Sequence, residues 1–164
     1  MSAQMPALES HIYAMIVNER HQLDSKARFL SLDPELVAIA RQRSTDMALK
    51  KSFAADDPHA SATMLMKQDA KFQGLVGENV AAQHFTPGAG IDVDAVAKNF
   101  VDGWLASAPH KENLSFADYD RTGVGASANG DTIYVTQLFT TSLGMEPHSA
   151  SAPPSQAEPV ASPR

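Results

Sequence analysis

The run Trp-Leu-Ala-Ser-Ala-Pro-His-Lys-Glu-Asn-Leu occupies positions 104–114 and begins inside the most regular apolar pattern of the chain. From Val93 to Leu105, apolar side chains recur three and four positions apart, which is the spacing of one face of an α-helix. The pattern predicts a helix over residues 92–107 with Trp104 on its buried face. His110, Asn113 and Leu114 are expected on a short turn after this helix.

After this run, apolar residues no longer recur every three or four positions, as in a helix, but every second position, as in a strand. Residues 122–128 and 132–140 read as strands on either side of Asn129-Gly130, a pair that tolerates the positive φ of a tight hairpin turn. On the second strand, Ile133, Val135, Gln137 and Phe139 should share one face, and Tyr134, Thr136 and Leu138 the other. The chain is therefore expected to end its folded part in an antiparallel hairpin.

Before this run, the pattern is helical. Apolar residues from Leu8 to Leu23 predict a first helix, and Asp33-Pro34 marks the start of a second helix that ends near Ser52. Turn-forming residues over 54–61 place His59 on a loop, and residues 62–72 should form a short third helix. Helices before and between strands predict an α+β fold in which helices cover a sheet.

Composition limits the classes of protein to which the chain can belong. At 164 residues and 43% hydrophobic content, it fits one domain with a real core. A net charge of −6 without a Lys or Arg block argues against nucleic acid as a partner. No apolar run reaches bilayer-spanning length, and the first ten residues do not look like a signal peptide. The chain has no Cys, which excludes disulfides and CxxC sites.

Four short blocks resemble the bacterial branch of the CAP superfamily, the cysteine-rich secretory, antigen 5 and pathogenesis-related domain. They are GENVA at 77–81, the run at 104–114, GVG at 123–125 and YVTQLF at 134–139, and Asn-Glu-Arg at 18–20 also fits. The resemblance implies a three-layer α-β-α sandwich with a mainly antiparallel central sheet and a C-terminal hairpin. It also implies a secreted or periplasmic location, since bacterial members are mostly exported.

The domain is expected over residues 8–142. Residues 143–164 are rich in Pro, Ala and Ser and contain little that could be buried. Such a segment cannot offset its ordering entropy, so a disordered tail is expected there.

The resemblance also implies a cleft in which His59, Glu78 and His110 meet. Imidazole and carboxylate groups are common zinc ligands, so these three residues are the predicted ligands of zinc or a similar divalent cation. Asn79 is expected to line the same cleft. Ser107 and Tyr134 should line it too, at positions where eukaryotic members have an acid and a second His.

Each of these residues also has a structural interpretation. Glu78 could fix its loop by accepting backbone N–H groups, and the Asn79 amide could bond two stretches of backbone. A loop His without a CxxC or HExxH partner is more often solvated than a metal ligand. Gly77, Gly123 and the neighbouring Gly125 indicate close backbone approach or positive φ.

Three functions stay open at this point. The first is a binding module that holds a divalent cation and a small apolar, lipid or cell-envelope ligand. The second is a peptide- or wall-directed hydrolase with Glu78 as general base and His59 or His110 as its partner, acting through water or a metal. The third is a structural interaction domain. The sequence does not decide the oligomeric state or the ligand.

Overall fold

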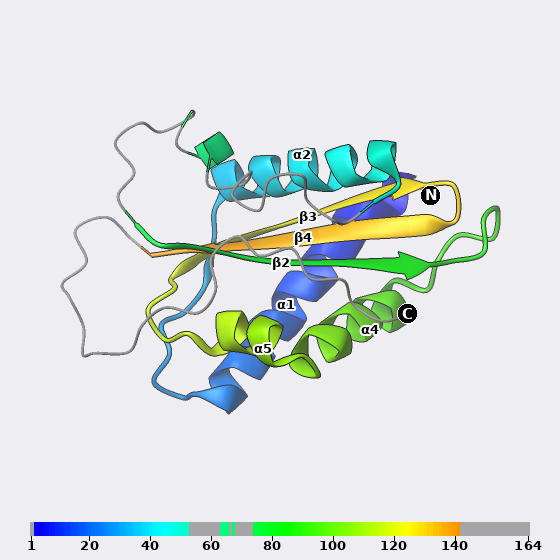
Figure 1. Ribbon diagram of the computed structural model, residues 1–164. Coiled ribbons are helices and arrows are strands. Elements are labelled where there is room, and N and C mark those ends of the chain that lie inside the picture. The colour runs from blue at the N-terminus through cyan, green and yellow to red at the C-terminus, as the bar shows by residue number, and fades with distance from the viewer. Residues whose placement is uncertain (1, 53–62, 66, 68–73, 142–164) are drawn as a thin grey trace.

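Four strands form the central sheet, in the spatial order β1-β3-β4-β2. The computed structural model describes residues 2–52, 63–65, 67 and 74–141 (Figure 1). Two pairings are antiparallel, β2 with β4 and β3 with β4, and the short β1 runs parallel to β3. The elements are η1 (Ser2–Gln4), α1 (Met5–Leu23), β1 (Ser31–Leu32), α2 (Pro34–Lys50), β2 (Val76–His84), α4 (Val93–Leu105), α5 (Ala108–Ser115), β3 (Arg121–Asn129) and β4 (Thr132–Thr140).

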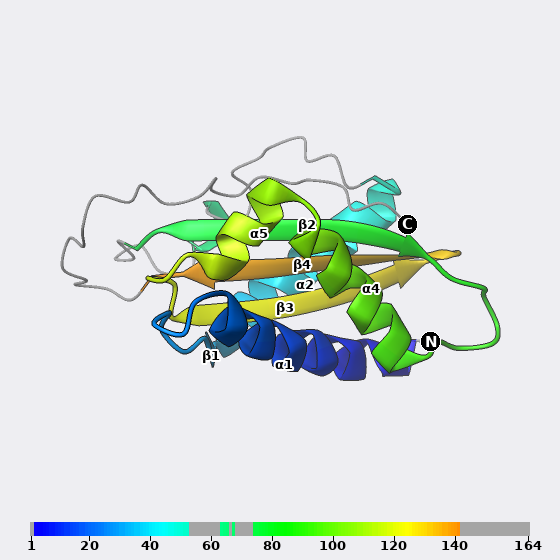
Figure 2. The ribbon, with the colours of Figure 1, turned by 90° about the horizontal axis from the view of Figure 1, so that it is seen from below.

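Helices cover both faces of this sheet. Helix α2 lies on one face, and α1, α4 and α5 lie on the other (Figure 1). Seen from below, these three helices stand in front of the strands and α2 lies behind them (Figure 2). The predicted α-β-α sandwich and its mainly antiparallel sheet are therefore confirmed. No helix in the described ranges is long and apolar enough to cross a membrane.

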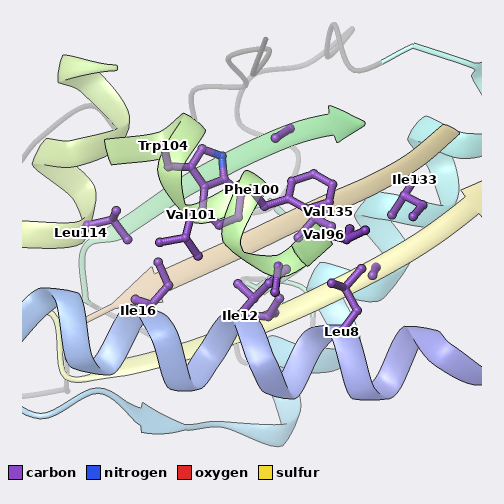
Figure 3. Close-up of a cluster of buried hydrophobic side chains, with 14 of the residues drawn as sticks. Leu8, Ile12, Ile16, Val96, Phe100, Val101, Trp104, Leu114, Ile133 and Val135 are labelled. Atoms are coloured by element: carbon purple, nitrogen blue, oxygen red, sulfur yellow. The ribbon is translucent and has the colours of Figure 1, made fainter. Parts of the chain in front are cut away.

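The main core lies between the sheet and the layer of α1, α4 and α5 (Figure 3). Trp104 is fully buried there, as predicted, and its Nε1 donates a hydrogen bond of 3.2 Å to the carbonyl of Val80. This bond satisfies the indole N–H while the ring is out of water. The labelled core residues in Figure 3 are Leu8, Ile12, Ile16, Val96, Phe100, Val101, Trp104, Leu114, Ile133 and Val135.

On the opposite face, two glycines let α2 approach β3 closely. A Cβ at Gly123 would stand 2.3 Å from the backbone nitrogen of Val37, and one at Gly125 would stand 2.1 Å from that of Arg41. No side chain fits at such distances, so the prediction of close backbone approach is confirmed for both. At Gly77 the close neighbour is a side chain and not a backbone, since a Cβ there would stand 2.5 Å from the Tyr119 hydroxyl.

Arg20 joins three segments through its buried guanidinium. Its side chain donates to five backbone carbonyl groups at 2.6–3.2 Å, which belong to Arg28, Leu114, Phe116, Ala117 and Tyr119. Burial lowers the pKa of Arg20 to about 10, and the charges of Asp24 and Asp120 oppose this effect. The Asn-Glu-Arg block thus fastens the end of α1 to the segment between α5 and β3.

Several predicted elements are confirmed with small shifts of their ends. The first helix starts earlier, at Met5, and helices α2 and α4 lie within their predicted ranges. The hairpin turns at Gly130, whose φ is +62°. The described residues 63–65 and 67 of the predicted third helix are helical. The predicted loop around His59 and the expected tail 143–164 lie outside the described residues.

Two local predictions are wrong. Glu78 lies on strand β2, not on a loop, and Asn113 lies in helix α5, not in a turn. Strand β2 is buried from Val76 to Ala82, so it shows no apolar alternation, and its Gly, Glu and Asn are poor strand formers. Helix α5 has only eight residues, too few to show a clear period.

Candidate functional site

Glu78 lies near the start of the edge strand β2, on the α2 face of the sheet, where it meets Arg43. Its side chain has no exposed surface, and that of Arg43 is 7% exposed. Nε of Arg43 is 3.2 Å from Oε2 of Glu78, and Nη2 is 3.3 Å from Oε1. The guanidinium therefore binds both carboxylate oxygens, an arrangement that suits its planar fork.

Further polar groups lie on the same face. Ser44, which follows Arg43 in α2, contacts the carbonyl of Gly125 at 2.8 Å and the hydroxyl of Thr136 at 2.9 Å. Tyr134 is 4% exposed and packs in a buried cluster with Met47, Ala48, Val80 and Ala82. The α2 face of β2 and β4 therefore combines an ion pair, two hydroxyl groups and an apolar patch.

Asn79 points to the other face of the sheet. Its Nδ2 donates to the carbonyl of His110 at 3.1 Å, and its Oδ1 accepts from Nδ2 of Asn113 at 2.9 Å. Asn113 Nδ2 also donates to the carbonyl of Glu78 at 3.1 Å. These bonds fasten α5 to β2, so Asn79 has the structural role that its amide suggested.

His110 belongs to this second layer as well. Its ring is 1% exposed and lies beside Trp104, with 6.5 Å between the ring centroids. Glu78 and Asn79 are consecutive residues of one strand, so their side chains leave opposite faces. The sheet therefore separates the Glu78 carboxylate from the His110 ring.

The structure thus brings together only part of the predicted site. Glu78 and Tyr134 share the α2 face, whereas Asn79 and His110 lie on the other face and Ser107 lies between α4 and α5. His59 falls outside the described residues. Within the described ranges, no three His, Cys, Asp or Glu side chains are grouped so that they could hold a metal ion.

Arg43 is the site residue that the sequence analysis missed. The signal was its position in the apolar stripe of α2, three residues after Ala40 and four before Met47, both of which are buried. A charged residue at such a position is rarely buried without a partner. The stripe therefore predicts a buried ion pair, although it does not identify Glu78 as the other member.

Comparison with known proteins agrees with this architecture. The family model described as the Cysteine-rich secretory protein family, CAP, matches residues 17–139. A comparison with curated protein sequences finds no match.

Solved structures of bacterial proteins share the fold. One is an extracellular protein with an SCP domain from Bacillus anthracis, with 25% identity and a TM-score of 0.64, covering 87% of this chain and 43% of that one. A cysteine-rich secretory protein from Staphylococcus aureus has 19% identity and a TM-score of 0.60, covering 85% and 40%. An outer surface protein from Borrelia burgdorferi has 23% identity and a TM-score of 0.58, covering 79% and 88%.

The chain spans about two fifths of the length of the first two of these proteins. The family model, in contrast, extends from α1 to the last strand and includes all four sequence blocks. The chain therefore belongs to the CAP family, the cysteine-rich secretory protein family, although it contains no cysteine itself.

Proposed function

We propose that this CAP domain is a binding module without catalytic activity, with its site on the α2 face around Glu78. One observation carries the proposal: the Glu78 carboxylate has no exposed surface, and Arg43 holds both of its oxygens. A general base must come within hydrogen-bond reach of the proton that it removes. A carboxylate enclosed in this way is better suited to hold a structure in place than to attack a substrate through water.

The ligand that we propose is a small apolar or cell-envelope molecule. The apolar cluster of Met47, Val80 and Tyr134 lies on the same face as the Arg43–Glu78 pair, so this layer offers both apolar and charged contacts to an amphipathic molecule. The three side chains of the cluster are 0–4% exposed, so the ligand must enter the layer to reach them. Two of the similar structures are those of an extracellular protein and an outer surface protein. This likeness supports a secreted or periplasmic location for the present chain.

A bound divalent cation was the other part of the predicted function. His110 lies across the sheet, which leaves Glu78 and His59 as its ligands. The described residues do not fit such an ion, because the Arg43 guanidinium already lies 3.2 and 3.3 Å from the two carboxylate oxygens. A second positive charge at the same oxygens would be repelled by the first.

Co-sedimentation with purified cell-wall material and with lipid vesicles, together with turnover assays on the same wall material and a peptide library, tests the proposal. We expect wild-type protein to bind one of the two materials and to cleave neither wall polymer nor peptide, with or without added zinc. Glu78→Gln should weaken binding, because it removes the charge that orients Arg43. Glu112→Gln is the matched control, since Glu112 is exposed on α5 in the opposite layer.

Turnover that disappears in Glu78→Gln, while the fold persists, would contradict the proposal and support the hydrolase alternative. The Glu78→Gln variant also tests Glu78 without disturbing His110, because the two residues lie on opposite faces of the sheet.

The separation of Glu78 from His110 favours one other candidate, a structural interaction domain in which the four blocks serve the fold. Trp104, Asn79 and Gly125 each have a packing or hydrogen-bonding role that needs no ligand. If neither wall material nor vesicles bind, and Glu78→Gln changes only stability, this candidate replaces the binding module.

A further inference from the structure

A buried carboxylate needs a positive charge or a proton close by. Glu78 has no exposed surface, and moving an ionised carboxylate out of water is costly unless the charge is paired and hydrogen-bonded. In a CAP domain with a metal site, a divalent cation could supply that charge. In this chain, the Arg43 guanidinium is already in contact with both oxygens.

The packing of α2 on the sheet fixes the position from which the Arg43 side chain projects. Ala40 and Met47, on the same stripe of α2, are 0% and 2% exposed. Gly125 lets the helix backbone approach β3, and Ser44 is hydrogen-bonded to the carbonyl of that glycine. Arg43 therefore projects from a closely packed side of α2, and its own side chain is 7% exposed, so the guanidinium has little room to move away from Glu78.

The neighbouring cation in the sequence is engaged elsewhere. Arg41 binds Glu9 at the outer edge of β3, with 2.6 Å between Nη2 and Oε1. The two arginines thus have separate partners on α1 and β2, and each neutralises one buried carboxylate. Arg43 on α2 thus already places a full positive charge against both oxygens of Glu78, and a divalent ion would have to bind against that charge.

We propose that Arg43 takes the place that a divalent cation would hold at Glu78, so that this CAP site is neutral and works without a metal. The inference rests on the place of the proposed site around Glu78 and not on the ligand bound there. It also explains why His110 need not face Glu78, since no ion has to be shared between them.

Zinc chloride is the probe for the test, with the full chain studied by isothermal titration calorimetry and thermal unfolding. For wild-type protein, we expect no saturable zinc binding at Glu78 and the same melting temperature in zinc and in EDTA. Arg43→Ala removes the fixed charge and leaves space beside the carboxylate. Zinc at about 100 times its dissociation constant should then raise the melting temperature of Arg43→Ala by roughly 5–10 °C.

Two further variants show whether the loss of the Arg43 charge causes the response of the melting temperature to zinc. Arg43→Lys keeps a cation beside Glu78, so its melting temperature should stay insensitive to zinc, as in wild type. Arg43→Ala with Glu78→Gln removes both charges, so it should melt at a higher temperature than Arg43→Ala alone and should not respond to zinc. A purely structural role for Arg43 would not make the zinc response depend on charge in this way.

The inference is overturned if wild-type protein binds zinc and Glu78→Gln weakens that binding, a comparison that does not need the Arg43 variants to fold. It is also overturned if folded Arg43→Ala does not respond to zinc, or if Arg43→Lys responds as strongly as Arg43→Ala. Failure of the proposed function would look different: wild-type protein would bind neither wall material nor vesicles, whatever the zinc titrations show.

Discussion

Oε2 of Glu9 in α1 accepts a hydrogen bond of 2.9 Å from the backbone N–H of Ala126 in β3. In the described residues, β1 pairs with β3 only at Arg121 and Thr122, so the rest of the outer edge of β3 has no strand beside it. An open strand edge is a template for pairing with another chain. Glu9 lies across this edge, and Arg41 of α2 holds its carboxylate.

We expect Glu9→Ala to destabilise the protein by about 2–3 kcal/mol, because the amide of Ala126 and the Arg41 guanidinium lose a charged partner. The variant should also self-associate as concentration rises, because the edge of β3 becomes accessible. Urea unfolding and sedimentation velocity measure the two effects. Glu112→Ala, the same change at an exposed position of α5, should alter neither. A Glu9→Ala protein that stays monomeric and as stable as wild type would show that the edge needs no cover.

Gly125→Ala should cost at least about 3 kcal/mol of unfolding free energy, since its Cβ would stand 2.1 Å from the backbone of Arg41 and α2 would have to move away from the sheet. Ser127→Ala, two positions along the same face of β3, is the control and should change stability by less than about 1 kcal/mol. Chemical denaturation of both variants makes the comparison. Equal stability of the two would mean that the contact between α2 and β3 is loose.

Arg20→Lys should destabilise the fold by about 3–5 kcal/mol although it keeps the charge, because one ammonium group cannot reach five carbonyl groups in two stretches of chain. The matched control is Arg121→Lys, whose side chain is 49% exposed and whose nearest acid, Asp33, is 3.6 Å away. That change should cost less than about 1 kcal/mol. If thermal unfolding ranks the two variants in the opposite order, the backbone carbonyl groups are held by something other than Arg20.

Burial raises the pKa of the Tyr119 hydroxyl above its ordinary value of 10, and the charge of Arg20 opposes the shift. Above about pH 10, the unfolded chain loses this proton while the folded protein keeps it, so the free energy of unfolding falls as pH rises. The contribution is complete below pH 10. Tyr119→Phe should be within about 1 kcal/mol of wild type at neutral pH and should lose less stability between pH 9 and 11. Identical pH slopes for the two proteins would rule out Tyr119 as a source of the alkaline loss.

The elements that the sequence predicted are those with a clear local signal. Helix α4 is buried on one side and exposed on the other, so its period of 3.6 was read correctly. Strand β4 is buried along its whole length, but its β-branched and aromatic residues and the Asn-Gly turn before it predicted the hairpin. Strand β2 is also buried over most of its length, and its Gly, Glu and Asn are poor strand formers, so no strand was predicted there and Glu78 was placed on a loop. Its nine-residue pairing with β4 is a contact between distant segments, which no local pattern contains.

The candidate site was harder to predict for a related reason. Glu78 and His110 are compatible in chemistry, but spacing along the chain does not say from which face of the sheet each one projects. The face depends on whether Glu78 is an odd or an even residue of β2, and this strand was not predicted. Arg43 could have been noticed as a cation in an apolar stripe, but its pairing with Glu78 depends on how α2 lies across β3 and β4 and which of its side chains reach β2.

Glu78 and Asn79 also determine how β2 can align with its neighbour. The carboxylate fits only the layer that contains Arg43, and the amide fits only the layer that contains Asn113. Sliding β2 by one residue along β4 would turn Glu78 towards the amide groups of α5 and would leave Arg43 facing a neutral side chain. A misaligned β2 would therefore lose hydrogen-bonding partners on both faces of the sheet. The Gly-Glu-Asn motif thus favours one alignment of β2 with β4 during folding.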